Sequence, residues 1–351
     1  MTGSRITLIK LRARRTQRFI LSLVTIAVLL GACSTISNVS RVNLTSNPTA
    51  LGHSQLVHAS LAYDGKAEVL FGGLFEGRSK TTSVLSGTWI ASNPNGIWNT
   101  VRYTQKNRWK GTLVYPNAGA YDESIKRLVA VSNVNGRFTT WTFHNNVWEP
   151  YPSGSLMTAT LHFHPVGVVY ANSVGSDVMV ACTIASVENM TMTMWKLTSA
   201  GWTPIPTSGN MPSCSDNLSV TYDNSRNAIV AYYFGRYWQW EKGVWRAIST
   251  SKPAPVMATI TSVAFAYDPL TQQDILFGSN LRHSVPTAQT WALYRNSWVE
   301  LHPTNSPPPS FNSAIAFDPS INKVVLMGGI TFRGGSVGQW DWNGSNWVRV
   351  S

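Results

Sequence analysis

The chain has 351 residues, of which 43% are hydrophobic and only 13% are charged, and its net charge is +12. This composition excludes a disordered or collagen-like chain. Six basic residues and no acidic residue lie within residues 1–32, which leaves 22 basic and 16 acidic residues in the remainder. An excess this small, spread along the chain, is not typical of a nucleic-acid-binding protein.

The amino terminus predicts export. A basic segment, KLRARRTQR, precedes the 14 uncharged residues FILSLVTIAVLLGA. A membrane-spanning helix needs about 20 apolar residues, whereas a signal peptide needs fewer and begins with basic residues. We therefore expect residues 1–32 to be a secretory signal peptide.

The apolar run ends in Leu30-Gly31-Ala32-Cys33, which resembles the bacterial lipobox. The resemblance implies cleavage before Cys33 and attachment of lipid to its thiol, which would anchor the protein to the extracytoplasmic face of a bacterial membrane. Ordinary cleavage beside a chance cysteine is the alternative. Residues 33–55 are rich in Ser, Thr and Asn and are predicted to be a flexible tether.

A repeat fills residues 56–351. The same pattern occurs six times. An apolar strand, which mostly ends in Tyr or Phe and then Asp, leads into a turn and a second apolar strand. An Asp at this position accepts hydrogen bonds from backbone amides two residues later, which stabilises a turn. The turn residues are Asp64, Asp122, Asp223, Asp268 and Asp318, with His164 in the place of Asp in the third repeat.

Each repeat then continues with a hairpin bracketed by two tryptophans. The closing members are Trp98, Trp148, Trp202, Trp245, Trp298 and Trp347, so that the period is near 50 residues. The pattern predicts four strands in each repeat, and an indole is large enough to fill the space between neighbouring sheets. We expect these tryptophans to form the core.

This pattern resembles the kelch family, whose repeats of about 50 residues each form a four-stranded blade of a β-propeller. Gly72-Gly73 and Gly328-Gly329 match the diglycine of that family, which is weakened to Gly278-Ser279 and Phe234-Gly235 in two other repeats. The resemblance implies an all-β, six-bladed propeller. How its ring closes is left open by the sequence.

Neither a metal nor a cofactor site is expected. Galactose oxidase, a catalytic relative within the wider propeller family, uses a copper site of His, Tyr and Cys ligands, whereas Cys182 and Cys214 have no such setting here. These two cysteines either form a disulfide between adjacent blades or remain free thiols. His162 and His164 share one face of a strand, but no third metal ligand accompanies them.

The candidate binding residues lie in the connections between the second and third strands, which a propeller places on one face. Five of the six connections contain an arginine. Converging guanidinium groups can hold carboxylate, sulfate or phosphate. The candidate binding residues are Arg78, Arg137, Arg236, Arg282 and Arg333, with His283 beside Arg282. The alternative is that arginines simply keep exposed loops soluble.

Three functions fit these features. The first is a non-catalytic, monomeric binding module that holds an anionic glycan or a protein through its channel face. The second is an envelope sugar epimerase or lyase on the same propeller, with His283 as a candidate base. The third is a structural scaffold within an envelope complex.

Overall fold

The structure is a computed structural model that describes the chain from Leu56 to Val350 with gaps. The described ranges are 56–76, 82–84, 87–92, 97–101, 118–134, 137–156, 162–186, 189–215, 217–257, 263–280, 286–333 and 335–350. Residues 42–351 form one compact unit, and the separate unit of residues 1–41 lies outside these ranges. The predicted signal peptide, Cys33 and the predicted tether therefore also lie outside the described residues.

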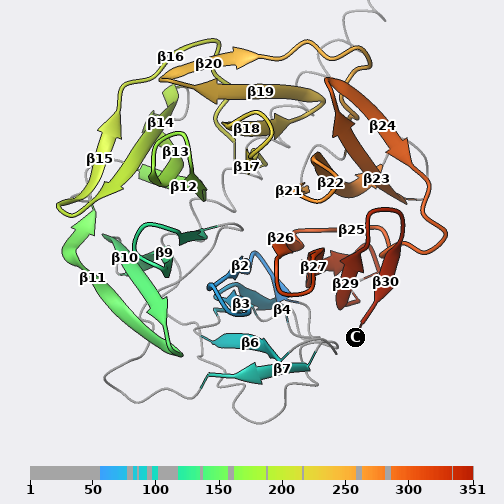
Figure 1. Ribbon diagram of the computed structural model, residues 1–351, viewed down its shortest axis with the longest axis horizontal. Coiled ribbons are helices and arrows are strands. Elements are labelled where there is room, and N and C mark those ends of the chain that lie inside the picture. Colours follow the sequence, from blue (N-terminus) through green and yellow to red (C-terminus); the bar gives the residue numbers. More distant parts are fainter. Residues whose placement is uncertain are drawn as a thin grey trace, which may run out of the picture. The chain divides into compact units, whose positions relative to one another are not determined.

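Six four-stranded antiparallel sheets surround a common centre, and the first strand of each lies nearest to it (Figure 1). Blade I contains β2 (Ser60–Tyr63), β3 (Glu68–Phe71), β6 (Thr88–Ser92) and β7 (Ile97–Thr100). Blade II contains β8 (Gly119–Asp122), β9 (Arg127–Val134), β10 (Arg137–His144) and β11 (Val147–Leu156). Blade III contains β12 (His162–Ala171), β13 (Ser176–Ser186), β14 (Asn189–Thr198) and β15 (Gly201–Ile205).

The carboxyl-terminal half of the chain forms the other three blades. Blade IV contains β17 (Ser219–Asp223), β18 (Ala228–Tyr233), β19 (Arg236–Glu241) and β20 (Val244–Ala247). Blade V contains β21 (Ala264–Asp268), β22 (Gln273–Asn280), β23 (Thr287–Tyr294) and β24 (Ser297–Leu301). Blade VI contains β26 (Ala314–Asp318), β27 (Lys323–Met327), β29 (Gln339–Trp342) and β30 (Trp347–Arg349). The six-bladed all-β fold is thus confirmed.

Short strands lie outside the blade pattern. A three-stranded sheet consists of β1 (Leu56–Val57), β4 (Leu74–Glu76) and β5 (Thr82–Val84). β25 (Ser310–Phe311) pairs with β28 (Ile330–Thr331), and β16 (Ser208–Gly209) runs parallel to β20. Within the described ranges the chain forms no helix with the length and hydropathy that a bilayer crossing requires.

The predicted Asp turns are confirmed. The Oδ1 atom of Asp64 accepts hydrogen bonds of 2.9 Å from the backbone amides of Lys66 and Ala67. The other four turn aspartates each accept at least one backbone hydrogen bond from two or three residues later. The first-to-second turn is therefore encoded locally in five blades.

The third blade differs from its prediction. Its first turn occupies residues 172–175, after Tyr170-Ala171, and Gly175 adopts a positive φ there. His164 instead pairs with Cys182 near the start of β12, seven residues before the end of that strand. The assignment of His164 to the turn Asp position is therefore wrong, because Ala171 takes that place and Gly175 supplies the turn.

The closing tryptophans join neighbouring blades. All six are buried, and in four of them Nε1 donates a hydrogen bond to the residue that precedes the opening tryptophan of the adjacent blade. These bonds are 2.8–2.9 Å long and run from Trp98 to Gln339, Trp148 to Thr88, Trp202 to Thr140, and Trp347 to Thr290. In the other two blades that preceding residue is Met194 or Tyr237, and the indole nitrogens of Trp245 and Trp298 have no partner in the described part.

The ring closes by packing of blade I against blade VI. All four described strands of blade VI come from the carboxyl-terminal end of the chain. Leu61 and Leu70 of blade I share a core with Val325 and Met327 of blade VI. The hydrogen bond from Trp98 to Gln339 spans the same contact. Blades I and VI are therefore joined by the same kind of tryptophan hydrogen bond as three other pairs of neighbouring blades.

Candidate functional site

The two ends of the ring differ in chemistry. The antiparallel order places all first-to-second turns on one side, which we call the turn face. The connections between second and third strands lie at the opposite strand ends, and we call that side the loop face. The predicted arginines belong to the loop face.

At the turn face, a cavity of about 260 Å³ lies between the first strands. Aromatic residues of all six blades line it, with two from blade V: Tyr63, Tyr121, Tyr170, Tyr222, Phe265, Tyr267 and Phe317. The Tyr222 hydroxyl donates to Asn227 Oδ1 at 2.6 Å and accepts from the Ser173 amide of blade III at 2.9 Å. Because at least one of these rings bridges two blades, and ligand pockets commonly measure about 300–1,000 Å³, we assign the aromatics to blade packing.

Three acidic side chains are buried beside the turn face. Glu68, Asp177 and Asp274 stand at one register of alternate blades I, III and V, opposite Tyr63, Tyr170 and Tyr267. All three are almost fully buried. Each lies near a turn aspartate of the preceding blade, namely Asp318, Asp122 and Asp223.

Their environment favours the protonated form. Burial, and to a smaller extent the Asp223 carboxylate, raise the pKa of Asp274 to about 8, against the smaller lowering effects of Tyr237 and Arg226. Tyr237 donates to Asp274 Oδ2 at 2.8 Å. Burial also raises the pKa values of Glu68 and Asp177 well above their ordinary range. A buried, protonated carboxyl avoids the cost of desolvating a charge.

On the loop face, the structure describes the side chains of two of the five predicted arginines. Arg236 is the first residue of β19, and Arg333 follows β28. Both side chains are exposed, and neither forms an ion pair with a carboxylate in the described part of the chain. Two guanidinium groups are therefore available to a ligand.

The structure describes less of the other predicted site residues. Arg137 begins β10 on the loop face, but its side chain lies outside the described part. Arg78, Arg282 and His283 fall outside the described residues altogether. Convergence of all five arginines on one ligand thus stays a prediction.

An exposed aromatic residue lies beside Arg236. Tyr233 pairs with Arg236, so Phe234 and Gly235 form a two-residue turn, with φ values of +48° and +75°. Such turns favour Asn-Gly, and a left-handed backbone costs a residue with a side chain about 1–2 kcal/mol. The Phe234 side chain nevertheless remains 47% exposed.

The register shows how unusual this phenylalanine is. Counting from the pairs Ser60–Phe71, Ser219–Tyr232 and Ala314–Met327, Phe234 occupies the place of Gly73 in blade I and Gly329 in blade VI. Those glycines have φ values of +94° and +89°. Blade IV thus places a bulky, exposed ring where two other blades use glycine.

Packing fixes the base of this turn. The Tyr233 and Phe234 rings lie 6.2 Å apart, and Tyr233 packs against the core between blades III and IV. On the other side, a Cβ added to Gly235 would lie 2.8 Å from Val256 Cγ2. The Tyr232 hydroxyl donates to the Pro255 carbonyl and accepts from the Gly235 amide at 3.3 Å.

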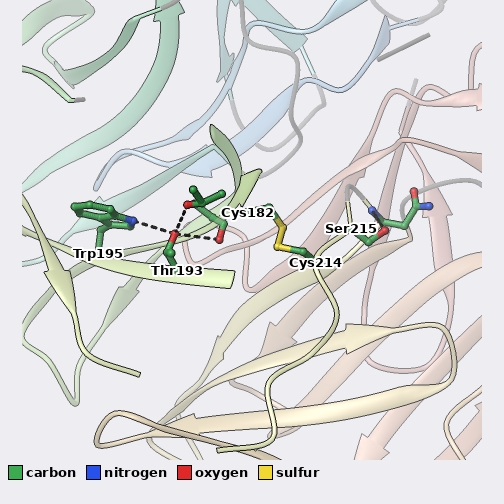
Figure 2. The surroundings of a disulfide bond; sticks show 8 residues. Cys182, Thr193, Trp195, Cys214 and Ser215 are labelled. Carbon is green, nitrogen blue, oxygen red and sulfur yellow. Dashed lines mark hydrogen bonds between the residues drawn. A yellow bond between two sulfur atoms is a disulfide. The ribbon is translucent and has the colours of Figure 1, made fainter. Parts of the chain in front are cut away.

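A disulfide joins blade III to the segment that enters blade IV (Figure 2). Cys182 is buried in β13, and Cys214 lies before β17 with a Cα–Cα distance of 5.6 Å. Cys214 packs against the same core as Tyr233. The connecting segment beside Tyr233 is therefore tied covalently to the neighbouring blade.

Blade VI repeats the combination of aromatic ring and arginine. Phe332 is 39% exposed and precedes Arg333. Its ring meets Phe311 edge to face at 5.4 Å. Exposed phenylalanines thus accompany both described arginines of the loop face.

Sequence reasoning missed the phenylalanines. The match of Phe234-Gly235 to the diglycine is wrong by one residue, because the register aligns Gly72-Gly73 with Tyr233-Phe234. His162 and His164 share β12, and their side chains lie outside the described part. Among the described residues, no three His, Cys, Asp or Glu side chains are grouped as metal ligands.

Comparison with known proteins identifies similar folds only. No family model and no curated protein matches the sequence. The Aleuria aurantia lectin AAL with Fucalpha1-6GlcNAc is 10% identical, with a TM-score of 0.54 over 84% of this chain and 96% of the lectin. The SapL1 lectin with alpha methyl fucoside is 12% identical, with a TM-score of 0.51 over 85% of this chain and 96% of the lectin.

A sialidase of Trypanosoma rangeli in complex with the inhibitor DANA has a similar fold as well. It is 9% identical, with a TM-score of 0.54, and the match covers 83% of this chain and 55% of the sialidase. At these identities the similarity shows the propeller fold, whereas function depends on the residues of the site.

Proposed function

We propose that this chain is an exported, lipid-anchored propeller of the kelch type that binds a glycan through its loop face without catalysis. The observation that carries the proposal is that blades IV and VI each place an exposed phenylalanine beside an exposed arginine, which forms no ion pair with any carboxylate that the structure describes. Aromatic faces and arginine donors together suit a ligand with apolar and polar or anionic parts. The lectins among the proteins of similar fold support a sugar as that ligand.

Replacing Arg236 and Arg333 together by Ala will weaken glycan binding at least tenfold. A charge-assisted hydrogen bond contributes about 1.5–3 kcal/mol, and about 1.4 kcal/mol corresponds to a factor of ten. The measurement is binding of the full-length protein in detergent to an array of neutral and acidic glycans at two salt concentrations.

Arg246→Ala with Arg295→Ala is the matched control. It removes the same charge from two exposed arginines that do not belong to the loop-face connections. Equal binding by both double variants would count against the loop face. Absence of binding to any glycan by the unaltered protein would refute the proposed function and favour a protein partner.

The anchoring part of the proposal rests on the sequence Leu30-Gly31-Ala32-Cys33. Cys33→Ser will remove the acceptor of the lipid, so we expect the protein to move from the membrane fraction to the soluble extracytoplasmic fraction. Fractionation of expressing bacteria measures this shift. Unchanged membrane association of the variant would exclude lipid attachment at Cys33.

The enzyme and scaffold alternatives have less support. The candidate base, His283, lies outside the described residues, so no observation of the site favours a sugar epimerase or lyase. A scaffold would need no exposed phenylalanine beside an exposed arginine. Both alternatives remain outcomes of the glycan experiment.

A further inference from the structure

The tip of the β18–β19 hairpin is the most unusual exposed feature of the loop face. Phe234 combines a left-handed backbone with a side chain that is 47% exposed. Backbone strain of this kind persists only where the surrounding structure holds it, and it gathers at ligand-binding sites. The exposed Phe234 ring therefore needs an explanation other than core packing.

The surroundings hold the tip firmly. Tyr233 packs on the core that also contains Cys182, and the disulfide to Cys214 ties the adjacent segment to blade III. Tyr232 reaches the carbonyl of Pro255 on the opposite side. A ring held in place before binding loses little conformational freedom when a ligand arrives.

The charge beside the ring indicates the class of ligand. Tyr233 and Arg236 are cross-strand partners, and Arg236 is exposed. In the described part of the chain, no carboxylate pairs with Arg236. An arginine presents paired donors that match the two oxygens of a carboxylate.

We propose that Phe234 and Arg236 form a contact point for a sugar that bears a carboxylate. The Phe234 ring lies against the apolar face of the pyranose, and the Arg236 guanidinium donates to the carboxylate. Phe332 and Arg333 form a second point of the same kind in blade VI. This inference deepens the proposed function and rests on it.

The test uses a substitution that relieves the backbone strain at Phe234 and removes its ring at the same time. Asn adopts the left-handed conformation readily, so Phe234→Asn is expected to raise the melting temperature by about 2 °C. The same substitution removes the stacking ring, so binding of the full-length protein to sialyllactose or oligogalacturonate is expected to weaken about tenfold. Methyl esters of the same sugars serve as neutral probes and are expected to bind weakly to both proteins.

Lys242→Asn is the matched control. Lys242 and Gly243 form the other two-residue hairpin of blade IV, with φ values of +48° and +84°. This variant relieves the same backbone conformation at the opposite end of β19. It is expected to raise the melting temperature similarly and to leave acidic-sugar binding unchanged.

The outcomes separate the two levels of the proposal. Acidic-sugar binding that Phe234→Asn leaves intact, or equal binding of the acids and their methyl esters, would overturn the role of this contact point while glycan binding stands. Binding of no glycan at all would overturn the proposed function as well.

Discussion

Replacing Trp347 by Ala will lower the free energy of unfolding by about 3–5 kcal/mol, because truncation of a fully buried tryptophan leaves a large cavity. The Trp347 side chain has no exposed surface, and its ring meets Phe277 of blade V at 5.7 Å. It therefore joins blades V and VI. Denaturant unfolding of the full-length protein, followed by tryptophan fluorescence and circular dichroism, measures the loss.

Thr290→Val separates the hydrogen bond from the packing. It removes the acceptor of Trp347 Nε1 with little change in shape, so that a buried donor loses its partner, at a cost of about 1–3 kcal/mol. Thr287→Val, at the exposed start of the same strand, is the control with almost no expected effect. A loss below about 1 kcal/mol for Trp347→Ala would contradict the role of the closing tryptophans as blade joints.

Asp274→Asn will stabilise the protein increasingly as the pH rises from about 4 to 8. Below pH 4 this group is protonated in both the folded and the unfolded chain. Between the two pKa values the unfolded chain ionises while the folded site, with a pKa of about 8, does not. Stability then falls by up to about 1.4 kcal/mol for each pH unit, and asparagine removes this loss.

The measurement is the free energy of unfolding of both proteins between pH 4 and pH 8.5. Asparagine keeps an oxygen that can accept from Tyr237, so the hydrogen bond persists. Glu123→Gln, at an exposed turn residue, is the control and is expected to follow the unaltered protein closely. Parallel pH curves for Asp274→Asn and the unaltered protein would show that the Asp274 carboxyl is not held protonated.

The fold was predictable because its signals are local and repeated. Asp64 and its counterparts specify their turns through hydrogen bonds within three residues. The tryptophan pairs predicted the outer hairpins. Blade III lacks this signal, because Ala171 has no carboxylate. The left-handed residue of its turn is Gly175, which lies four residues after Ala171, as Lys126 lies four residues after Asp122.

The joints between blades were only partly predictable. The residue before each opening tryptophan is Thr or Gln in four blades, and the sequence shows this once the partner is known. The partner tryptophan is 57–62 residues away in three of these joints and 241 residues away in the fourth, so it depends on which blades lie next to each other. The alternation of Glu68, Asp177 and Asp274 likewise becomes visible only when the blades are aligned by register.

The sequence indicated the arginines of the candidate site but not its phenylalanines. The arginines follow from counting residues in the loop-face connections, and the two whose side chains are described are exposed, which fits both a ligand site and ordinary solubility of the loops. Phe234 required the register, because its strain is apparent only when it takes the place of Gly73 and Gly329. The turn is held by packing of the neighbouring Tyr233 and by contacts with Pro255 and Val256, which lie more than 20 residues further along the chain.

The most direct test of glycan binding at the loop face is hydroxyl-radical footprinting of the full-length protein with and without a bound glycan. Our account predicts protection of Tyr233, Phe234 and Phe332, and unchanged oxidation of Tyr63 and Tyr121 at the turn face. Protection of Tyr63 and Tyr121 with unchanged Phe234 and Phe332 would place the ligand at the channel cavity and contradict the account.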